Sequence, residues 1–136
     1  MTTNTNPPGT AWMQIVKKNG TSDFAASFTA DARLQTSALS KAVVGPTLIG
    51  AFFAATSKMY EHVEFTAETV DGAKTYLEWD GIYAGKSVAG ATLLTRNESG
   101  LINNIKLFQS PFSVVREFSS GLEERLAGTL GQDFFS

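Results

Sequence analysis

Polar and apolar side chains alternate along much of the chain between residues 62 and 109, with the period of two that is typical of half-buried β-strands. In the first stretch Val63, Phe65 and Ala67 are apolar, whereas the residues between them are polar. Short turn-forming segments rich in Gly, Asp, Asn or Ser divide this region into predicted strands at 62–70, 74–83, 87–96 and 101–109. Connections this short join antiparallel neighbours, so the sequence predicts an antiparallel meander.

Outside this region apolar residues recur every three or four positions, which is the spacing of one face of an α-helix. The pattern predicts a helix over residues 10–19, a short second helix from Ser22, a long helix from Pro46 and a last helix from Ser110. A further half-buried strand is predicted over residues 29–36. The predicted fold class is α+β, with the N-terminal helices and the long helix packed on a curved antiparallel sheet.

The composition fits one small domain. The chain has 136 residues, 43% of them hydrophobic, which is enough to build a core without a disulfide or a structural metal. It contains no cysteine and one histidine, His62, so thiol chemistry, zinc fingers and sites with two histidines are excluded. We expect a domain over residues 10–127, a disordered tail over 1–9 and a C-terminal tail over 128–136.

Charge and hydropathy argue against nucleic-acid and membrane partners. The net charge is −2 without a basic run, so we expect no nucleic-acid partner. No apolar stretch approaches the ~20 residues that a bilayer-spanning helix needs. Residues 1–9 lack the basic and apolar parts of a secretory signal, so we expect a cytoplasmic protein without a membrane partner. No motif indicates a cofactor or a metal.

Several short motifs follow one another in a defined order along the chain: FTADARL at 28–34, VGP at 44–46 leading to Phe52-Phe53, GKSVAG at 85–90, ESGLI at 98–102, and Ser110-Pro111. In this order and spacing they resemble the nuclear-transport-factor-2-like proteins of the SnoaL-like kind, which include polyketide cyclases and ketosteroid isomerase. The resemblance covers about residues 10 to 127. It implies a cone-shaped fold with a deep pocket open at one end, and a homodimer that packs through the outer sheet face.

The catalytic positions that the resemblance implies are vacant. Ketosteroid isomerase needs a carboxylate base, and a tyrosine and a protonated acid that hold the substrate oxygen. The resemblance places these roles at Thr36, at Trp12 or Met13, and at about Ala91, and none of these residues can fill them. The acidic residue that SnoaL-type cyclases carry towards the end of the last strand is missing from residues 106–110. The sequence therefore lacks the catalytic residues of these two activities.

Together with the cone that the resemblance implies, the alternation also predicts a cavity for a small, mainly apolar ligand. Side chains of a strand point to opposite faces in turn, so the apolar sets of neighbouring strands share one side of the sheet, which is concave in a cone. Aromatic residues on that side would suit an apolar or planar molecule. The alternative is that the same residues fill a solid core. The predicted lining residues are Trp12, Val16, Phe53, Tyr60, Phe65, Leu77, Trp79, Leu93 and Phe108.

Two polar residues are candidates for acid/base catalysis. His62 carries an imidazole, which titrates near working pH. Glu78 lies between Leu77 and Trp79, and a β-bulge at that point would turn its carboxylate inward. On an exposed or dimer-facing surface both residues would only contribute solubility.

Three functions therefore stay open. The first is a domain of unestablished activity that binds a small apolar molecule. The second is an isomerase, cyclase or dehydratase with a nonstandard acid/base residue, which predicts an ionisable group at the floor of the cavity. The third is a non-catalytic structural dimer module, which predicts a cavity below roughly 300 Å³.

Overall fold

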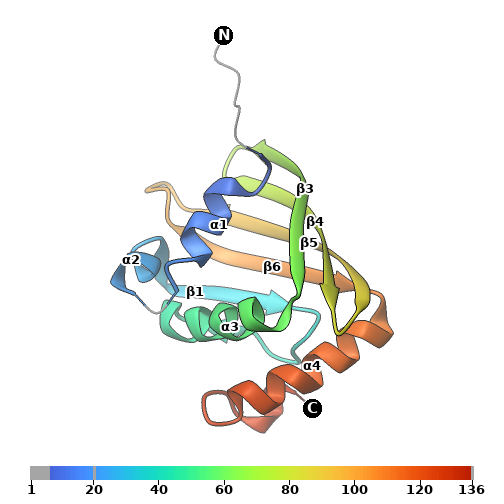
Figure 1. Ribbon diagram of the computed structural model, residues 1–136. Coiled ribbons are helices and arrows are strands. Elements are labelled where there is room, and N and C mark those ends of the chain that lie inside the picture. The colour runs from blue at the N-terminus through green and yellow to red at the C-terminus, as the bar shows by residue number, and fades with distance from the viewer. Residues whose placement is uncertain (1–6, 20, 136) are drawn as a thin grey trace.

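The computed structural model describes residues 7–19 and 21–135 and contains one curved sheet of six strands (Figure 1). The meander β3–β6 is antiparallel throughout, as predicted. The sheet as a whole is mixed, because β1 runs parallel to β6 and antiparallel to β2. The order across the sheet is β2-β1-β6-β5-β4-β3, with bounds β1 Phe28–Thr36, β2 Val43–Val44, β3 His62–Asp71, β4 Lys74–Tyr83, β5 Lys86–Arg96 and β6 Ile102–Ser110.

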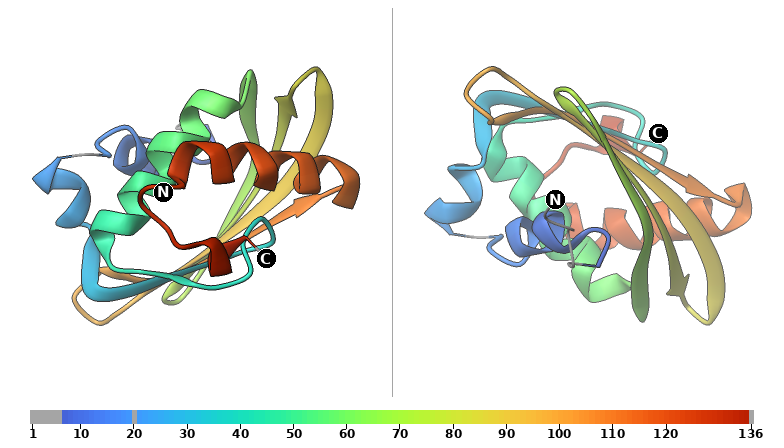
Figure 2. Two further views of the ribbon diagram at one scale, coloured as in Figure 1. Left: turned by 90° about the horizontal axis from the view of Figure 1, so that it is seen from below. Right: turned by 90° about the horizontal axis from the view of Figure 1, so that it is seen from above.

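The helices gather on one side of this sheet, and the described residues place no helix on its other side (Figure 2). Helices α3 and α4 pack against each other and on the sheet, while α2 contacts α3 and α1 lies beside α2 (Figure 1). None of the helices in the described part of the chain is long and apolar enough to cross a membrane. Their bounds are α1 Thr10–Val16, α2 Ser22–Ala25, α3 Pro46–Met59 and α4 Phe112–Leu126, followed by the short 3₁₀ helix η1 Gln132–Phe134.

The hydrophobic core lies between the concave face of the sheet and helices α3 and α4. Burial removes these side chains from water, which is the main force that stabilises the fold. Leu77 belongs to this core and is 1% exposed. Other fully buried members of the core include Leu34, Ile49, Phe52, Leu94, Ile105, Phe118 and Leu122.

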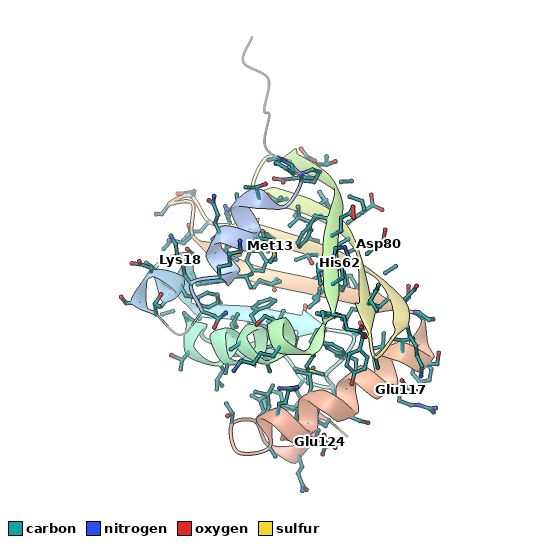
Figure 3. All side chains as sticks on the ribbon, viewed as in Figure 1. Met13, Lys18, His62, Asp80, Glu117 and Glu124 are labelled. Atoms are coloured by element: carbon teal, nitrogen blue, oxygen red, sulfur yellow. The ribbon has the colours of Figure 1, made fainter. Side chains whose placement is uncertain are left out.

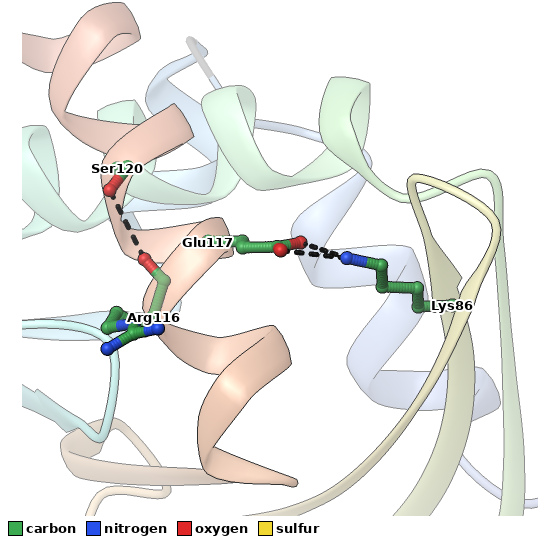
Figure 4. A network of polar contacts seen from close by, with 4 residues as sticks. All are labelled: Lys86, Arg116, Glu117 and Ser120. Carbon is green, nitrogen blue, oxygen red and sulfur yellow. Dashed lines mark hydrogen bonds and ion pairs between the residues drawn. The ribbon is translucent and has the colours of Figure 1, made fainter.

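Helix α4 is tied to the rest of the domain at both of its sides. Lys86, where the hairpin between β4 and β5 turns, donates to both carboxylate oxygens of Glu117 at 2.7 Å (Figure 4). Ser119 donates its hydroxyl proton to the carbonyl oxygen of Ala38 at 2.7 Å. The ion pair is about half exposed, so it is worth at most ~1 kcal/mol. Apolar packing therefore carries most of the attachment of α4.

A β-bulge in β3 reverses the faces of the strand. Phe65 pairs with Trp79 and Ala67 pairs with Glu78, so Thr66 between them is the extra residue. Beyond the bulge Glu68 lies opposite Leu77 and therefore on the concave face. The prediction that Ala67 shares a face with Val63 and Phe65 is wrong for this reason.

Both predicted tails contain ordered parts. Gly9 is buried, its N–H donates to Glu68 Oε1 at 2.8 Å, and its φ of 78° suits glycine. A Cβ at Gly9 would overlap the ring of Phe65, so glycine lets the start of α1 close over β3. Residues 1–6 of the predicted N-terminal tail lie outside the described residues.

The C-terminal segment folds back on the domain. Leu130 is 4% exposed in the core cluster, and Ser40 N–H donates to the carbonyl oxygen of Phe134 at 2.7 Å. Lys41 and Asp133 form an ion pair at 2.6 Å, and Lys41 lies 5.0 Å from the centroid of the Phe134 ring. This segment is therefore part of the domain rather than a free tail, because its apolar residues find a place on the core. Ser136 lies outside the described residues.

Candidate functional site

A cavity of about 80 Å³ lies between α1, the C-terminal half of α3 and the concave face of the sheet. Met13 marks its α1 side in Figure 3. Its walls are mainly apolar and come from segments far apart in the sequence. They are Trp12, Met13, Val16, Phe53, Thr56, Ser57, Tyr60, Val63, Phe65, Trp79, Thr92 and Leu107.

Aromatic rings fix the shape of this cavity. Trp12 and Phe53 meet edge to face with their ring centroids 5.3 Å apart, and Tyr60 and Trp79 do so at 5.5 Å. Trp79 is 5% exposed, and its indole N–H donates to Thr92 Oγ1 at 3.1 Å. This hydrogen bond joins neighbouring strands and holds the indole across the sheet, so one wall of the cavity is rigid.

Tyr60 brings a hydroxyl to the cavity from the end of α3. Its ring stacks on Phe118 with 4.8 Å between centroids, and its oxygen accepts a hydrogen bond from Gln109 Nε2 on β6. Burial raises the pKa of the Tyr60 hydroxyl far above its ordinary value, and the hydrogen bond from Gln109 offsets only part of that rise. Tyr60 therefore stays neutral and protonated at physiological pH.

Six of the predicted lining residues meet around this cavity: Trp12, Val16, Phe53, Tyr60, Phe65 and Trp79. The other three lie elsewhere. Leu77 is in the solid core. Phe108 is 54% exposed opposite Ala91, and Leu93 pairs with the exposed Tyr76, so both lie on the outer face of the sheet. The prediction that Leu93 and Phe108 line the cavity is wrong, because Thr92 and Leu107 are the inward residues at these points.

Both candidate acid/base residues lie outside the cavity. Glu78 is exposed on the outer face, because the bulge occurs in β3 and leaves the faces of β4 unchanged. The side chain of His62 is 61% exposed, with its Nε2 3.9 Å from Glu64 Oε1. His62 instead lines an open groove of about 510 Å³ with Glu64, Asp80 and Ser110. The prediction that either residue serves an enclosed site is contradicted by these positions.

The cavity lining offers hydroxyl groups but no strong acid or base. Among the described residues that line it, Tyr60 is the one titratable group, and no cluster of His, Asp and Glu in the described ranges could hold a metal ion. Thr36 is buried, and its hydroxyl accepts a hydrogen bond from Ala38 N at 3.2 Å. Ala91 is exposed on the outer face. Among the described residues, the lining of the cavity therefore offers hydroxyl groups and no carboxylate or imidazole.

The sequence analysis missed three polar residues on the concave side. Thr92 and Gln109 occupy inward positions of β5 and β6, and Glu68 turns inward after the bulge. The alternation does not mark Thr92 and Gln109 as inward, because each adjoins a pair of apolar residues whose inward member it does not identify. No sequence signal marks the bulge that places Glu68.

Sequence comparison finds no match: no family model fits the chain, and no curated protein matches it. Structural comparison finds clear likenesses. An uncharacterised bacterial protein with a cystatin-like fold from Silicibacter pomeroyi DSS-3 has a TM-score of 0.77 at 20% identity, over 85% of this chain and 82% of that one. A steroid delta-isomerase from Pseudomonas aeruginosa has a TM-score of 0.76 at 16% identity, over 87% and 88% of the two chains.

The chain has the nuclear-transport-factor-2-like fold. A third structure, a protein with a ketosteroid isomerase-like fold from Catenulispora acidiphila DSM 44928, is a complex with trimethylamine. Its TM-score is 0.59 at 23% identity, over 85% of this chain and 95% of that one. At these identities the likeness is one of fold, and a nuclear-transport-factor-2-like fold alone does not select a chemistry. The function has to be argued from the cavity.

Proposed function

We propose that this nuclear-transport-factor-2-like domain binds a small, mainly apolar molecule in the cavity between α1, α3 and the sheet. The proposal rests on the aromatic lining of this cavity, to which Trp12, Phe53, Phe65 and Trp79 contribute. None of the described lining residues carries a charge. Such a lining favours binding of an apolar ligand, because binding removes apolar surface from water. Binding without proton transfer is favoured over an isomerase, cyclase or dehydratase, because His62 and Glu78 lie outside this space.

The volume sets the size of the ligand. A cavity of about 80 Å³ is roughly half of the ~150 Å³ that holds benzene in an engineered apolar cavity, so the ligand is smaller than benzene. Trimethylamine, found in the Catenulispora protein, is a molecule of this size. The volume also lies below the roughly 300 Å³ at which most ligand pockets begin. A cavity of this small size is what the structural-module alternative predicts. A direct binding measurement separates the two.

The two tryptophans make that measurement possible. The chain has two tryptophans, and both Trp12 and Trp79 line the cavity, so each indole N–H resonance in a ¹H–¹⁵N spectrum reports on it. Titration with methylenecyclobutane is expected to shift both resonances saturably. Val63→Phe, which fills the space from its wall, is expected to abolish the shift, whereas Val70→Phe on the exposed end of the same strand is expected to preserve it. A wild-type protein whose indole resonances do not respond would exclude the proposal and favour the structural module.

We also propose that the outer face of the sheet pairs with a second copy of the chain. Its centre is apolar, with Phe108 paired with Ala91 and Tyr76 paired with Leu93. The charges on this face are unevenly distributed, which supports a two-fold pairing. The β3–β4 side carries Glu64, Glu78 and Asp80 with Lys74, and the β1–β6 side carries Arg33 and Lys106 with Asp31. A two-fold axis near β5 would bring the acidic side of one copy over the basic side of the other.

Sedimentation velocity tests this pairing. The wild type is expected to sediment with twice the chain mass of 14.6 kDa at micromolar concentration. Phe108→Asp is expected to give monomers, because two carboxylates would face an apolar contact. Phe112→Asp is the matched control, since Phe112 is 75% exposed on α4, and this variant is expected to remain dimeric. Monomers in the wild type would contradict the proposal.

A further inference from the structure

Three elements frame the opening of the cavity. The lining residues that water reaches are Met13 on α1, Ser57 and Tyr60 on α3, and Val63 and Phe65 on β3. The other residues of the lining are buried. A molecule therefore enters between α1, α3 and β3.

Of these three elements, α1 is held least firmly. Strand β3 pairs with β4 along its whole length, and α3 packs on α4 and on the sheet. Helix α1 has seven residues, and a helix so short is not stable by itself. With one exception, the hydrogen bonds described for residues 7–19 stay within residues 7–21. The position of α1 therefore depends on side-chain packing and on that one bond.

The exception joins the start of α1 to β3, and we call this contact the latch. Gly9 N–H donates to Glu68 Oε1 at 2.8 Å. Glu68 is within reach because the bulge at Thr66 turns it to the concave face. Gly9 also lies directly against Phe65, whose ring a Cβ at this position would overlap. The latch lies beside the opening, since Phe65 is one of the residues that frame it.

Trp12 links the position of α1 to the interior of the cavity. It is 4% exposed, and its ring meets those of Phe28 and Phe53 edge to face at 6.5 Å and 5.3 Å. The opposite side of α1, with Gln14 and Lys17, is exposed. Movement of α1 away from β3 therefore takes Trp12 out of the lining and opens the cavity to water.

We propose that α1 is the gate of the cavity and that Glu68 is the positioning residue that keeps it closed through Gly9. This inference rests on the proposed function, since a gate controls how fast a ligand enters and leaves. The gate has to open in both directions. A weaker latch therefore speeds binding and release by the same factor and leaves the dissociation constant nearly unchanged.

Hydrogen–deuterium exchange of the two indole N–H groups tests the gate without a ligand. Glu68→Ala removes the acceptor and is expected to speed exchange at Trp12 about fivefold, the factor that one net hydrogen bond corresponds to. Exchange at Trp79 is expected to stay unchanged, because its indole remains bonded to Thr92. Glu68→Gln keeps an acceptor oxygen and is expected to restore most of the protection. Glu64→Ala, which removes an exposed carboxylate on the outer face of the same strand, is expected to change neither rate.

A second pair of variants changes the latch from the side of α1. Gly9→Ala is expected to speed exchange at Trp12 at least as much, because its Cβ would overlap the ring of Phe65. Gly100→Ala is its control. The φ of Gly100 is 84°, close to the 78° of Gly9, but nothing lies within 4 Å of a Cβ there. This control is expected to leave exchange at Trp12 unchanged.

Ligand kinetics give the second readout. Line shapes of the Trp79 indole resonance during titration with methylenecyclobutane yield the rates of binding and release. Both rates are expected to rise about fivefold in Glu68→Ala, the same factor as the exchange at Trp12. A weaker dissociation constant with an unchanged rate of binding would overturn the gate, because Glu68 would then act on the bound state alone.

The outcomes separate the gate from the function on which it rests. If Glu68→Ala speeds exchange at both tryptophans alike, or at neither, α1 is not a gate, and the titration of the wild type still decides the binding function. If exchange at Trp12 responds as expected but the wild type binds no methylenecyclobutane, the proposed function is wrong and the latch on α1 stands.

Discussion

Replacing Phe118 by alanine is expected to lower the free energy of unfolding by about 3–5 kcal/mol, the largest effect of any truncation argued for this protein. Phe118 is 2% exposed and joins α4 to the rest of the core. Its ring stacks on Tyr60 at 4.8 Å and meets Tyr83 edge to face at 5.1 Å. Its removal leaves a void between rigid rings that cannot collapse to fill it, so the loss includes both the transfer energy and the missing contacts.

Urea denaturation of a matched pair on the same helix measures this effect. Phe112 begins α4 and is 75% exposed, with Arg116 over its ring at 5.8 Å. Phe112→Ala is expected to change the free energy of unfolding by no more than ~0.5 kcal/mol, because little area leaves or enters water. Equal effects of the two substitutions would mean that α4 does not pack on the sheet through Phe118.

The meander was predictable because its information is local. The predicted strand at 74–83 has the same bounds as β4. The predicted strands at 62–70, 87–96 and 101–109 differ from β3, β5 and β6 by one residue at one end or at both ends. Alternation and turn residues act over a few positions, so a single sequence carries them. The parallel pairing of β1 with β6 was not predicted, because it joins residues about seventy positions apart and leaves no local pattern.

The cavity could be predicted only where the alternation is unambiguous. Around Trp79 each apolar residue has polar neighbours, and the inward face is clear. At Leu93-Leu94 and at Leu107-Phe108 two apolar residues are adjacent, so periodicity cannot tell which one points inward. The assignment of Leu93 and Phe108 to the cavity failed at these doublets.

Polar inward residues escaped prediction for a different reason. Thr92 and Gln109 violate the rule that polar side chains of a strand face water, yet each meets a hydrogen-bonding group inside. Trp79 needs an acceptor for its indole N–H, and Tyr60 needs a partner for its hydroxyl, because buried polar groups are costly when unpaired. These partners are set by three-dimensional proximity, which the order of residues along one chain does not reveal.

Replacing Gly90 by alanine is expected to lower the free energy of unfolding by about 2–3 kcal/mol, because a Cβ there would overlap the indole ring of Trp79. Gly90 pairs directly with Trp79 across β4 and β5, so the indole lies flat over the glycine. The ring is held on its other edge by the hydrogen bond to Thr92 at 3.1 Å. Relief of the overlap requires the ring to move, which breaks that bond or pushes the indole into the cavity.

Gly128→Ala is the matched control, because nothing lies within 4 Å of a Cβ at that position. It is expected to be neutral or to stabilise the protein by about 0.5 kcal/mol through the lower entropy of the unfolded chain. Urea denaturation measures both variants, and the Trp79 indole resonance shows whether the ring has moved. Gly90→Ala with unchanged stability and an unchanged resonance would mean that Trp79 does not lie over β5. The aromatic wall on which ligand binding depends would then be absent, because the indole that lines the cavity is placed by the space that Gly90 leaves open.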